Sequence, residues 1–196
     1  MSETGVIKFQ CEHAAVDLAP FFAFAELKMA RQKMRELGLV GVDDHGIGFG
    51  NVSVRDDAMK SFYITGSGTG GLSDLTVKDC AKVIAWDFDR NWLRCEGETV
   101  ASAESLTHAA VYSMDRDVRI VMHGHSARLW RWLLEQGPAT RGDVAYGTPE
   151  MAREVQRLFV ETDVRTKKIF AMKGHVNGFI AFGNNLADAL SALDFN

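Results

Sequence analysis

The stretch "RIVMHGHSAR", residues 119–128, decides the fold class because it reads as a buried strand that ends in two histidines. Ile120, Val121 and Met122 form an apolar run of the kind found in sheet cores. Successive side chains of a strand point to opposite faces, so His123 and His125 share one face. The strand therefore directs two imidazoles at one point.

Outward from this strand, helical and extended patterns interleave along the chain. Helical spacing, stop signals and caps predict helices at residues 21–37, 102–114, from Pro149 onward and at 185–193. Gly38 is the expected stop of the first helix, and Thr148 the expected N-cap before Pro149. Strands are expected at residues 49–55, 61–68, 81–97 as a hairpin turning at 89–91, 168–172 and 178–182. This order favours a sheet with helices packed against it.

Composition and charge limit the functional classes. The 196 residues are 46% hydrophobic and 24% charged, which predicts one domain over residues 1–196. A net charge of -4 gives no basic face for nucleic acid. No run of about eighteen apolar residues occurs, and the first ten residues lack a signal-peptide pattern, so a cytoplasmic protein without membrane contact is expected. The three cysteines lack C-x-x-C spacing and indicate inert thiols.

The histidine pair indicates a metal site. A lone histidine is usually a packed or surface residue, but two imidazoles on one face suit a divalent ion. A third protein ligand is needed, and His175 lies in the loop "KGHVNG", where it can turn toward a neighbouring strand end. Three histidines would leave coordination positions open, as catalytic sites require.

Glu104 is the candidate acid or base. It lies at the start of the predicted helix at 102–114, with Ser102 as the expected N-cap. It is then either a favourable helix-start acid or a proton carrier. His108, four residues later on the same helical face, is expected to hydrogen-bond Glu104 or to support the metal ligands.

The glycine-rich stretch "GSGTGG", residues 66–71, matches the dinucleotide pattern only formally, because no long helix follows it. It is either ordinary turn chemistry or a backbone nest that holds an anion without lysine or arginine. The residues expected to form this neutral phosphate or polyol cradle are Gly50, Asn51, Thr65, Gly66, Ser67 and Ser102.

Taken in order, the segments "FGNVSVR", "FYITGSGT", "LSDLTVKD", "CEG", "SAESLTHAAVY", "VRIVMHGHS", "YGTPEMA" and "GHVNGFIAFG" resemble the class II aldolase/adducin family from about residue 21 to 193. The resemblance implies an α/β fold of three layers, α/β/α, around a mostly antiparallel central sheet. It also implies a divalent metal ion, usually zinc, held by three histidines, and a catalytic glutamate. His123 and His125 fall on the H-x-H ligands, Glu104 on the acid, and the cradle residues on the phosphate loops.

The chain departs from the family pattern at several positions. The third histidine of the family opens an H-G pair before the last strand, where this chain has Asn177-Gly178. His175 is nevertheless the expected ligand, because an amide is a poor zinc ligand beside an imidazole. Ala103 replaces the second serine of S-S-E, and the segment 126–146 is short. A tail that carries the further catalytic tyrosine of some family members is not expected.

The resemblance implies an aldolase-type lyase that acts on a small sugar or sugar phosphate through a metal-stabilised enediolate, with Glu104 moving the proton. A sugar-phosphate epimerase or dehydratase, a metal-dependent hydrolase and a non-catalytic adducin-like binding module are the alternatives. The expected substrate is a small carbonyl compound. A homo-oligomer is expected, a tetramer being favoured, with the aromatic pair Trp130 and Trp132 as a candidate contact.

Overall fold

An eight-stranded sheet runs through the computed structural model, which describes residues 6–56 and 60–194. In chain order the elements are β1 (Gln10–Ala15), α1 (Phe24–Glu36), β2 (Gly41–Val42), β3 (Gly48–Phe49), β4 (Asn51–Arg55), β5 (Phe62–Thr65), η1 (Thr69–Gly71), η2 (Val77–Asp79), β6 (Cys80–Asp87), β7 (Trp92–Gly97), α2 (Ser105–Met114), β8 (Ile120–His125), α3 (Ala127–Gln136), α4 (Pro149–Glu161), α5 (Val164–Lys167), β9 (Ile169–Ala171), β10 (Gly178–Gly183) and α6 (Leu186–Ser191). The strand order is β1-β7-β6-β5-β4-β8-β10-β9. Among the strand pairs of the described residues, only β1–β7 is parallel, so the expected mostly antiparallel sheet is confirmed.

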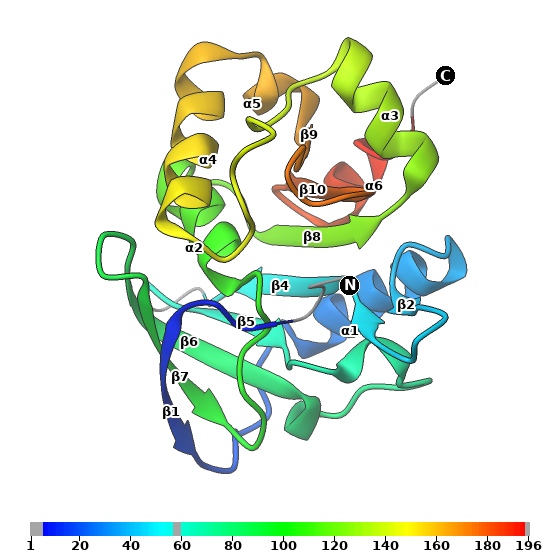
Figure 1. Cartoon of the computed structure of the whole chain (residues 1–196). Coiled ribbons are helices and arrows are strands. Elements are labelled where there is room, and N and C mark those ends of the chain that lie inside the picture. Colours follow the sequence, from blue (N-terminus) through cyan, green and yellow to red (C-terminus); the bar gives the residue numbers. More distant parts are fainter. Residues whose placement is uncertain (1–5, 57–59, 195–196) are drawn as a thin grey trace.

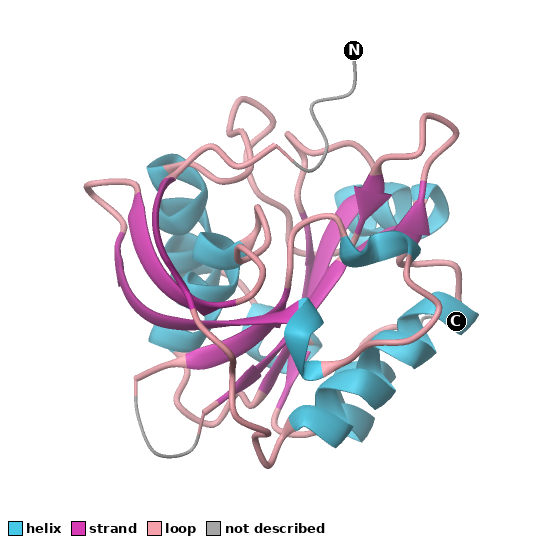
Figure 2. Cartoon of the chain, turned by 90° about the horizontal axis from the view of Figure 1, so that it is seen from below, coloured by secondary structure: helices cyan, strands magenta, loops and turns pink. Residues whose placement is uncertain are grey.

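Helices cover both faces of the sheet (Figures 1 and 2). On one face, Leu106 of α2 and Val155 of α4 share a core with Val121 of β8. On the other face, Leu27 of α1 packs in a second core with Met122 of β8, and α3 and α6 join it there. The three-layer α/β/α architecture that the resemblance implied is therefore present.

At its histidine end, β8 directs side chains to both faces of the sheet. His123 and His125 follow Val121 at the two-residue period and face the α2 side, whereas Gly124 between them faces α1. A Cβ added to Gly124 would lie 2.7 Å from Met34 Cε and 2.8 Å from Phe179 Cζ. The glycine between the two histidines is thus required by the packing of α1 on the opposite face.

Gly124→Ala is expected to lower the free energy of unfolding by about 1–3 kcal/mol, because the added methyl overpacks the α1 side of β8. Urea unfolding of the metal-free protein measures this loss. Gly142→Ala is the matched control, since a Cβ there meets only the Lys173 side chain at ordinary contact distances of 3.4 to 3.5 Å. Equal stability changes in the two variants would contradict this prediction, because they would show that α1 moves to make room for the methyl group.

Two helix-end signals and the hairpin turn were predicted correctly. Gly38 has φ +68° and follows α1, and the next amide, that of Leu39, donates to the Met34 carbonyl oxygen at 2.8 Å. Thr148 caps α4 by accepting from the Met151 amide at 3.3 Å. The β6–β7 hairpin turns at residues 88–91, where the last residue is an asparagine with φ +48°.

The expected helix cap at Ser102 was wrong. α2 begins at Ser105, and Glu104 stands at the position before it. The Ser102 main-chain carbonyl accepts from the Ser105 amide at 3.0 Å and from the Ser105 hydroxyl at 2.6 Å. A tight turn therefore precedes the helix and leaves the Glu104 side chain outside it.

The aromatic pair that was the candidate oligomer contact lies on a helix that was not predicted. Trp130 and Trp132 lie on α3, an element absent from the predicted set, and both are half-buried against the second core. The Trp130 indole N–H donates to the Met172 carbonyl oxygen at 3.0 Å. The edge strand β1 was likewise not predicted. Within residues 6–56 and 60–194, no helix is long and apolar enough to cross a membrane, and residues 1–5 of the segment tested for a signal peptide lie outside this range.

Candidate metal centre and active site

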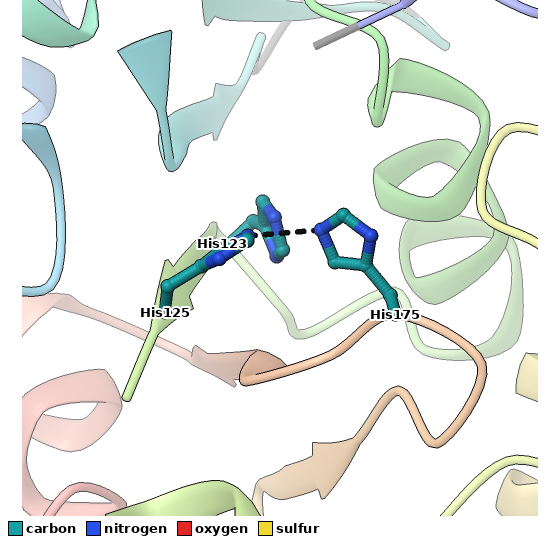
Figure 3. Close-up of side chains that lie close together, drawn as sticks. All are labelled: His123, His125 and His175. Atoms are coloured by element: carbon teal, nitrogen blue, oxygen red, sulfur yellow. Dashed lines mark hydrogen bonds between the residues drawn. The ribbon is translucent and has the colours of Figure 1, made fainter. Parts of the chain in front are cut away.

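Three histidines from two segments meet at one end of the sheet (Figure 3). His123 and His125 come from β8, and His175 comes from the loop between β9 and β10. One nitrogen of each ring lies within 4.8 Å of the others. Nε2 of His125 and Nε2 of His175 are 2.9 Å apart. The structure thus brings together the three histidines that the sequence singled out.

The orientation of the His123 ring is fixed by the strand beside it. Nδ1 of His123 lies 3.0 Å from the Phe179 carbonyl oxygen of β10. A carbonyl only accepts, so Nδ1 carries the hydrogen and Nε2 keeps its lone pair. The backbone of His123 is held on both sides, by Asn51 of β4 and Ile180 of β10.

The loop between β9 and β10 presents His175 rather than Asn177. The His175 amide donates to the Met172 carbonyl oxygen at 2.9 Å, and the Gly178 amide donates to the His175 carbonyl oxygen at 2.8 Å. Asn177 has φ +65° at the loop's end. A Cβ on Gly178 would lie 2.2 Å from Cδ2 of His175, so this glycine leaves the space that the imidazole occupies.

His175→Ala is expected to reduce metal content at least about tenfold, because it removes an imidazole from the cluster. Asn177→Gly is the matched control, since glycine keeps the left-handed conformation of the same loop and should leave metal content unchanged. Elemental analysis of both purified variants measures the difference. Greater metal loss in the Asn177 variant would transfer the ligand role to that position.

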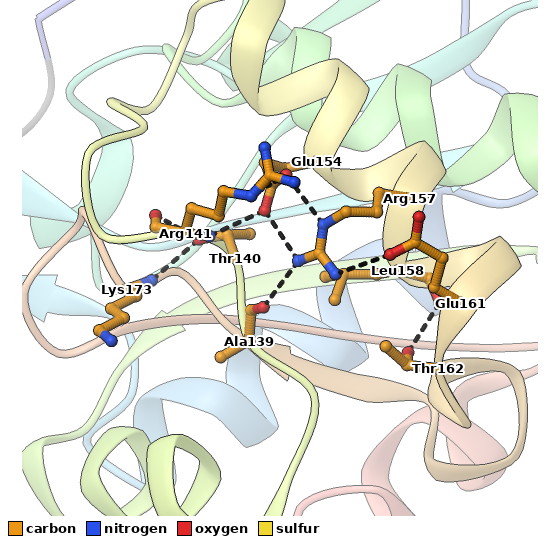
Figure 4. Close-up of polar contacts among 9 residues, drawn as sticks. All are labelled: Ala139, Thr140, Arg141, Glu154, Arg157, Leu158, Glu161, Thr162 and Lys173. Atoms are coloured by element: carbon orange, nitrogen blue, oxygen red, sulfur yellow. Dashed lines mark hydrogen bonds and ion pairs between the residues drawn. The ribbon is translucent and has the colours of Figure 1, made fainter.

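A partly buried ion pair anchors the segment beside this loop (Figure 4). Glu154 of α4 accepts from Arg157 Nη2 at 2.8 Å, and the same guanidinium nitrogen donates to the Ala139 carbonyl oxygen at 3.2 Å. The hydrogen bond from Arg157 holds the pKa of Glu154 below its ordinary value. Next in the chain, the Thr140 hydroxyl accepts from the Lys173 amide at 3.0 Å. α4 thereby helps to hold the loop that carries the third histidine.

Burial keeps the three imidazoles neutral. It lowers the pKa of His125 to about 4 and the pKa of His175 to about 3, the latter helped by the charges of His125 and Lys8. Burial and the two neighbouring histidines hold the pKa of His123 well below its ordinary value. Neutral imidazoles are the form that binds a metal ion.

Glu104 lies in the wall of the same cleft as His123 and His175. It is 3% exposed, and its carboxylate accepts from the Thr107 hydroxyl at 2.9 Å. Burial raises the pKa of Glu104 to about 7, opposed by the Thr107 hydrogen bond and by the charge of Lys8. A carboxyl group with this pKa can be protonated or ionised near neutral pH.

The His108 side chain does not hydrogen-bond the Glu104 carboxylate, which was one of its two expected roles; only its amide donates to the Glu104 carbonyl oxygen, at 3.0 Å. Its Nδ1 lies 2.7 Å from the Ser53 hydroxyl of β4, which in turn lies 2.8 Å from the Tyr112 hydroxyl. Its Nε2 is buried without a hydrogen-bond partner. Burial lowers the pKa of His108 to about 3. His108 and Tyr112 therefore belong to a polar network under α2 and are not among the residues that line the cleft.

The glycine segments form the remaining walls of the cleft. Its lining residues are Gly48, Phe49, Gly50, Asn51, Gly66, Ser67, Gly68, Thr69, Gly70, Ser102, Ala103, Glu104, His123 and His175. Of the six cradle residues expected from the sequence, only Thr65 is absent from this set. It is buried, and its hydroxyl accepts from the Val52 amide at 3.2 Å. Oδ1 of Asn51 is buried in the wall without a partner and is available to a ligand.

Two residues near the histidines were not predicted. The Tyr146 ring packs edge to face against His175, with ring centres 4.6 Å apart. The Lys8 ammonium lies 4.2 Å from the centre of the Tyr146 ring. Lys8 precedes β1, which pairs with β7 at the far edge of the sheet. No local pattern marks such a long-range approach, and only the pairing of β1 could have indicated it.

The model of the class II aldolase and adducin N-terminal domain matches residues 30–195. The chain belongs to the class II aldolase and adducin family. The family assignment that the sequence motifs indicated is therefore confirmed, and no curated protein sequence matches the chain.

Solved structures of class II aldolases share the fold. An L-fuculose 1-phosphate aldolase is 20% identical with a TM-score of 0.66, and the match covers 90% of this chain and 82% of that one. An L-fuculose-1-phosphate aldolase from Thermus thermophilus is 22% identical with a TM-score of 0.58, over 87% and 83% of the two chains. A sugar-phosphate aldolase from Thermotoga maritima is 15% identical with a TM-score of 0.59, over 86% and 87%. At these identities the likeness concerns the fold.

Proposed function

We propose that this class II aldolase family protein is a metal-dependent aldolase-type lyase that acts on a small sugar or sugar phosphate. The observation that carries the proposal is the cleft that His123 and His175, two of the three clustered histidines, line together with the buried Glu104. A binding module of the same fold has no use for three neutral imidazoles beside a buried acid. Family membership supports the same interpretation.

The three imidazole nitrogens fit a divalent metal ion, and zinc fits them best. Zinc binds imidazole nitrogens at about 2.0–2.1 Å in a tetrahedral arrangement, whereas magnesium and calcium prefer oxygen ligands. His123 Nε2, oriented by the Phe179 carbonyl, and the facing Nε2 atoms of His125 and His175 would hold the ion. When bound, the ion supplies Lewis-acid stabilisation of the negative charge that develops on a carbonyl oxygen.

Glu104 supplies the proton transfer in this proposal. Its pKa of about 7 allows the carboxylate to take a proton from a substrate hydroxyl or carbon and to return it later. The Thr107 hydroxyl holds one carboxylate oxygen and so limits the rotation of the side chain. The position before α2, outside the helix, leaves the carboxyl at the cleft wall.

The rest of the wall orients the substrate. Oδ1 of Asn51 lacks a partner and can accept from a substrate hydroxyl. Ser67 and Ser102 line the cleft and offer hydroxyls for a phosphate or polyol. The alanine at position 103, where the family motif has a second serine, removes one such donor.

Metal content by elemental analysis, followed by a screen of phosphorylated and free aldehydes and ketoses, tests the function. We expect metal-dependent cleavage of a carbon–carbon bond, detected as a new aldehyde product. A change of stereochemistry without cleavage, or the loss of water, would replace the lyase with an epimerase or a dehydratase on the same site. Absence of both metal and turnover would contradict the proposal and favour a non-catalytic module.

A further inference from the structure

Residues 6–15 lie outside the part of the chain that the family model matches, yet they are built into the fold. β1 pairs in parallel with β7 at the edge of the sheet. Phe9 is buried in the core that α2 and α4 cover, and Ile7 packs against the same core. Lys8 stands between these two anchored residues.

The main chain around Lys8 is held from both sides. Asn91, the last residue of the β6–β7 turn, donates from Nδ2 to the Lys8 carbonyl oxygen at 2.9 Å, and its own carbonyl oxygen accepts from the Gln10 amide at 2.8 Å. The Val6 amide donates to the Tyr146 hydroxyl oxygen at 3.2 Å. Lys8 therefore has a fixed position, although it lies before the first strand.

The Lys8 side chain reaches the surroundings of the cleft. Its ammonium lies 4.2 Å from the centre of the Tyr146 ring, which packs against His175. Gly147 separates the Lys8 stem from the main chain before Glu104. A Cβ on this glycine would lie 3.5 Å from Lys8 Cβ and 3.3 Å from the carbonyl oxygen of the residue that precedes Glu104. The N-terminal segment thus brings a cation close to the wall that carries Glu104.

Lys8 supplies a positive charge beside a cleft whose lining includes no lysine or arginine. Burial raises the pKa of Glu104, and the Thr107 hydrogen bond and the charge of Lys8 oppose this rise. Burial lowers the pKa of His175, and the charges of His125 and Lys8 add to this effect. One ammonium therefore favours the carboxylate form of the acid and the neutral form of the imidazole.

The other titratable groups around Glu104 are imidazoles. His123 and His175 line the cleft with it, and His108 lies four residues further along the chain on α2. Burial lowers the pKa of all three, so they carry no charge near neutral pH. Among the described residues, Lys8 is therefore the charged group that acts on Glu104.

We propose that Lys8 is a positioning residue of the active site, whose ammonium stabilises the Glu104 carboxylate from a segment outside the residues that the family model matches. Lys8 acts through Glu104 and forms or breaks no bond itself. The inference rests on the proposed function only in taking Glu104 as the group that moves the proton. The charge coupling between the two side chains can be measured without turnover.

A double-mutant cycle of Lys8→Met and Glu104→Gln measures this coupling. The equilibrium constant of folding comes from urea unfolding of the full chain after chelation, at about pH 5 and about pH 8. At the higher pH, where Glu104 is ionised, Lys8→Met should lower this constant about three- to tenfold more when position 104 is glutamate than when it is glutamine. At the lower pH the folded state holds the carboxyl protonated, so the coupling should vanish.

Two further variants separate charge from structural damage. Lys8→Arg keeps the charge, so its coupling to Glu104 should differ from that of the wild-type lysine by less than about twofold. Lys33→Met is the matched control. Lys33 lies on α1, across the sheet from α2, and pairs with Glu36 at 2.8 Å. Its removal should show no coupling to Glu104.

The metal-loaded enzyme provides a second readout, the pH profile of kcat/KM on the substrate found by the screen. Without the ammonium the pKa of Glu104 rises, so Lys8→Met should move the acidic limb of the profile upward by about half a pH unit to one pH unit. The rate on the alkaline side of that limb should stay nearly unchanged. Lys8→Arg should restore the wild-type profile.

Coupling that is absent at the higher pH, of equal size at both pH values, or equally large for Lys33→Met would overturn the proposal. An unshifted pH profile, or equal effects of Lys8→Arg and Lys8→Met, would do the same. Failure of the proposed lyase activity would leave the charge coupling in place, so the two ideas fail separately.

Discussion

Glu104→Gln is expected to slow turnover by about two to four orders of magnitude, the range typical of general acid–base groups. Glutamine keeps the shape of the side chain and can still accept from the Thr107 hydroxyl, but it cannot take up a proton. Metal content should largely persist, because the three imidazoles are untouched. Steady-state rates on the substrate found by the screen, together with elemental analysis, measure both effects.

The same substitution should change the pH dependence of stability in the metal-free protein. Glu104 has an ordinary pKa of 4.5 and a folded value of about 7. Its stabilising contribution is full below 4.5 and is lost as the pH rises through about 7, because the folded state binds this proton more tightly. Above pH 7 the buried charge costs on the order of 3 kcal/mol, which glutamine removes. Urea unfolding at about pH 5 and about pH 8 should show a more stable variant only at the higher pH.

Glu150→Gln is the matched control for Glu104. Glu150 is an exposed acid in the first turn of α4, so it represents a helix-start acid without a site. Its replacement should leave activity unchanged and cost about 0.3–1 kcal/mol through the helix dipole. If Glu104→Gln behaved like this control, Glu104 would be removed from the mechanism.

His123→Ala and His125→Ala should each reduce the metal content from about one divalent ion per chain to near zero, because two nitrogen ligands from the protein hold such an ion poorly. Activity should be lost with the ion. Bound metal also stabilises the folded state, by about 4 kcal/mol at a thousandfold excess over the dissociation constant. A chelator should therefore lower the melting temperature of the wild-type protein and leave both variants unchanged.

His45→Ala provides the comparison for the histidine variants. His45 is exposed in the turn between β2 and β3 and takes no part in the cluster. Its removal should leave metal content and the chelator response as in the wild-type protein. Metal retained in both β8 variants would contradict the proposed ligand set.

The parts of the fold that follow from short-range pattern were predictable. The two-residue period of β8 indicated that His123 and His125 share a face, and the structure has them there. Gly38, Thr148 and the hairpin turn act through contacts within a few residues. Such local signals are present in the sequence itself, and the ordered motifs added the layer architecture.

One error comes from a contact between distant segments, and another from a tight turn that the residue types alone do not reveal. His108 is on the expected helical face, yet its partner is Ser53, 55 residues away on β4. Ser102 has the chemistry of a cap, but the turn to Ser105 moves the helix start. Glu104 therefore precedes the helix, and its carboxylate accepts a hydrogen bond from the Thr107 hydroxyl.

Arg31 shows a different limit of sequence reasoning. It lies between Leu27 and Met34 on the buried face of α1, where an arginine breaks the apolar pattern. That departure was the available signal. The hydrogen-bond partners of its guanidinium are the Thr69 and Gly70 carbonyl oxygens, which only the folded chain brings close to it.

Gly124 has a consequence for how this site can change over evolutionary time. Because α1 fills the space on one side of β8 and the imidazoles occupy the other, His123 and His125 cannot shift without rebuilding the core. His175 lies instead on a connecting loop, where insertions and deletions are tolerated far better. Divergence in the spacing of the proposed metal ligands should therefore accumulate in the loop before β10, where the proposed ligand His175 precedes Asn177, the position at which the family pattern has its third histidine.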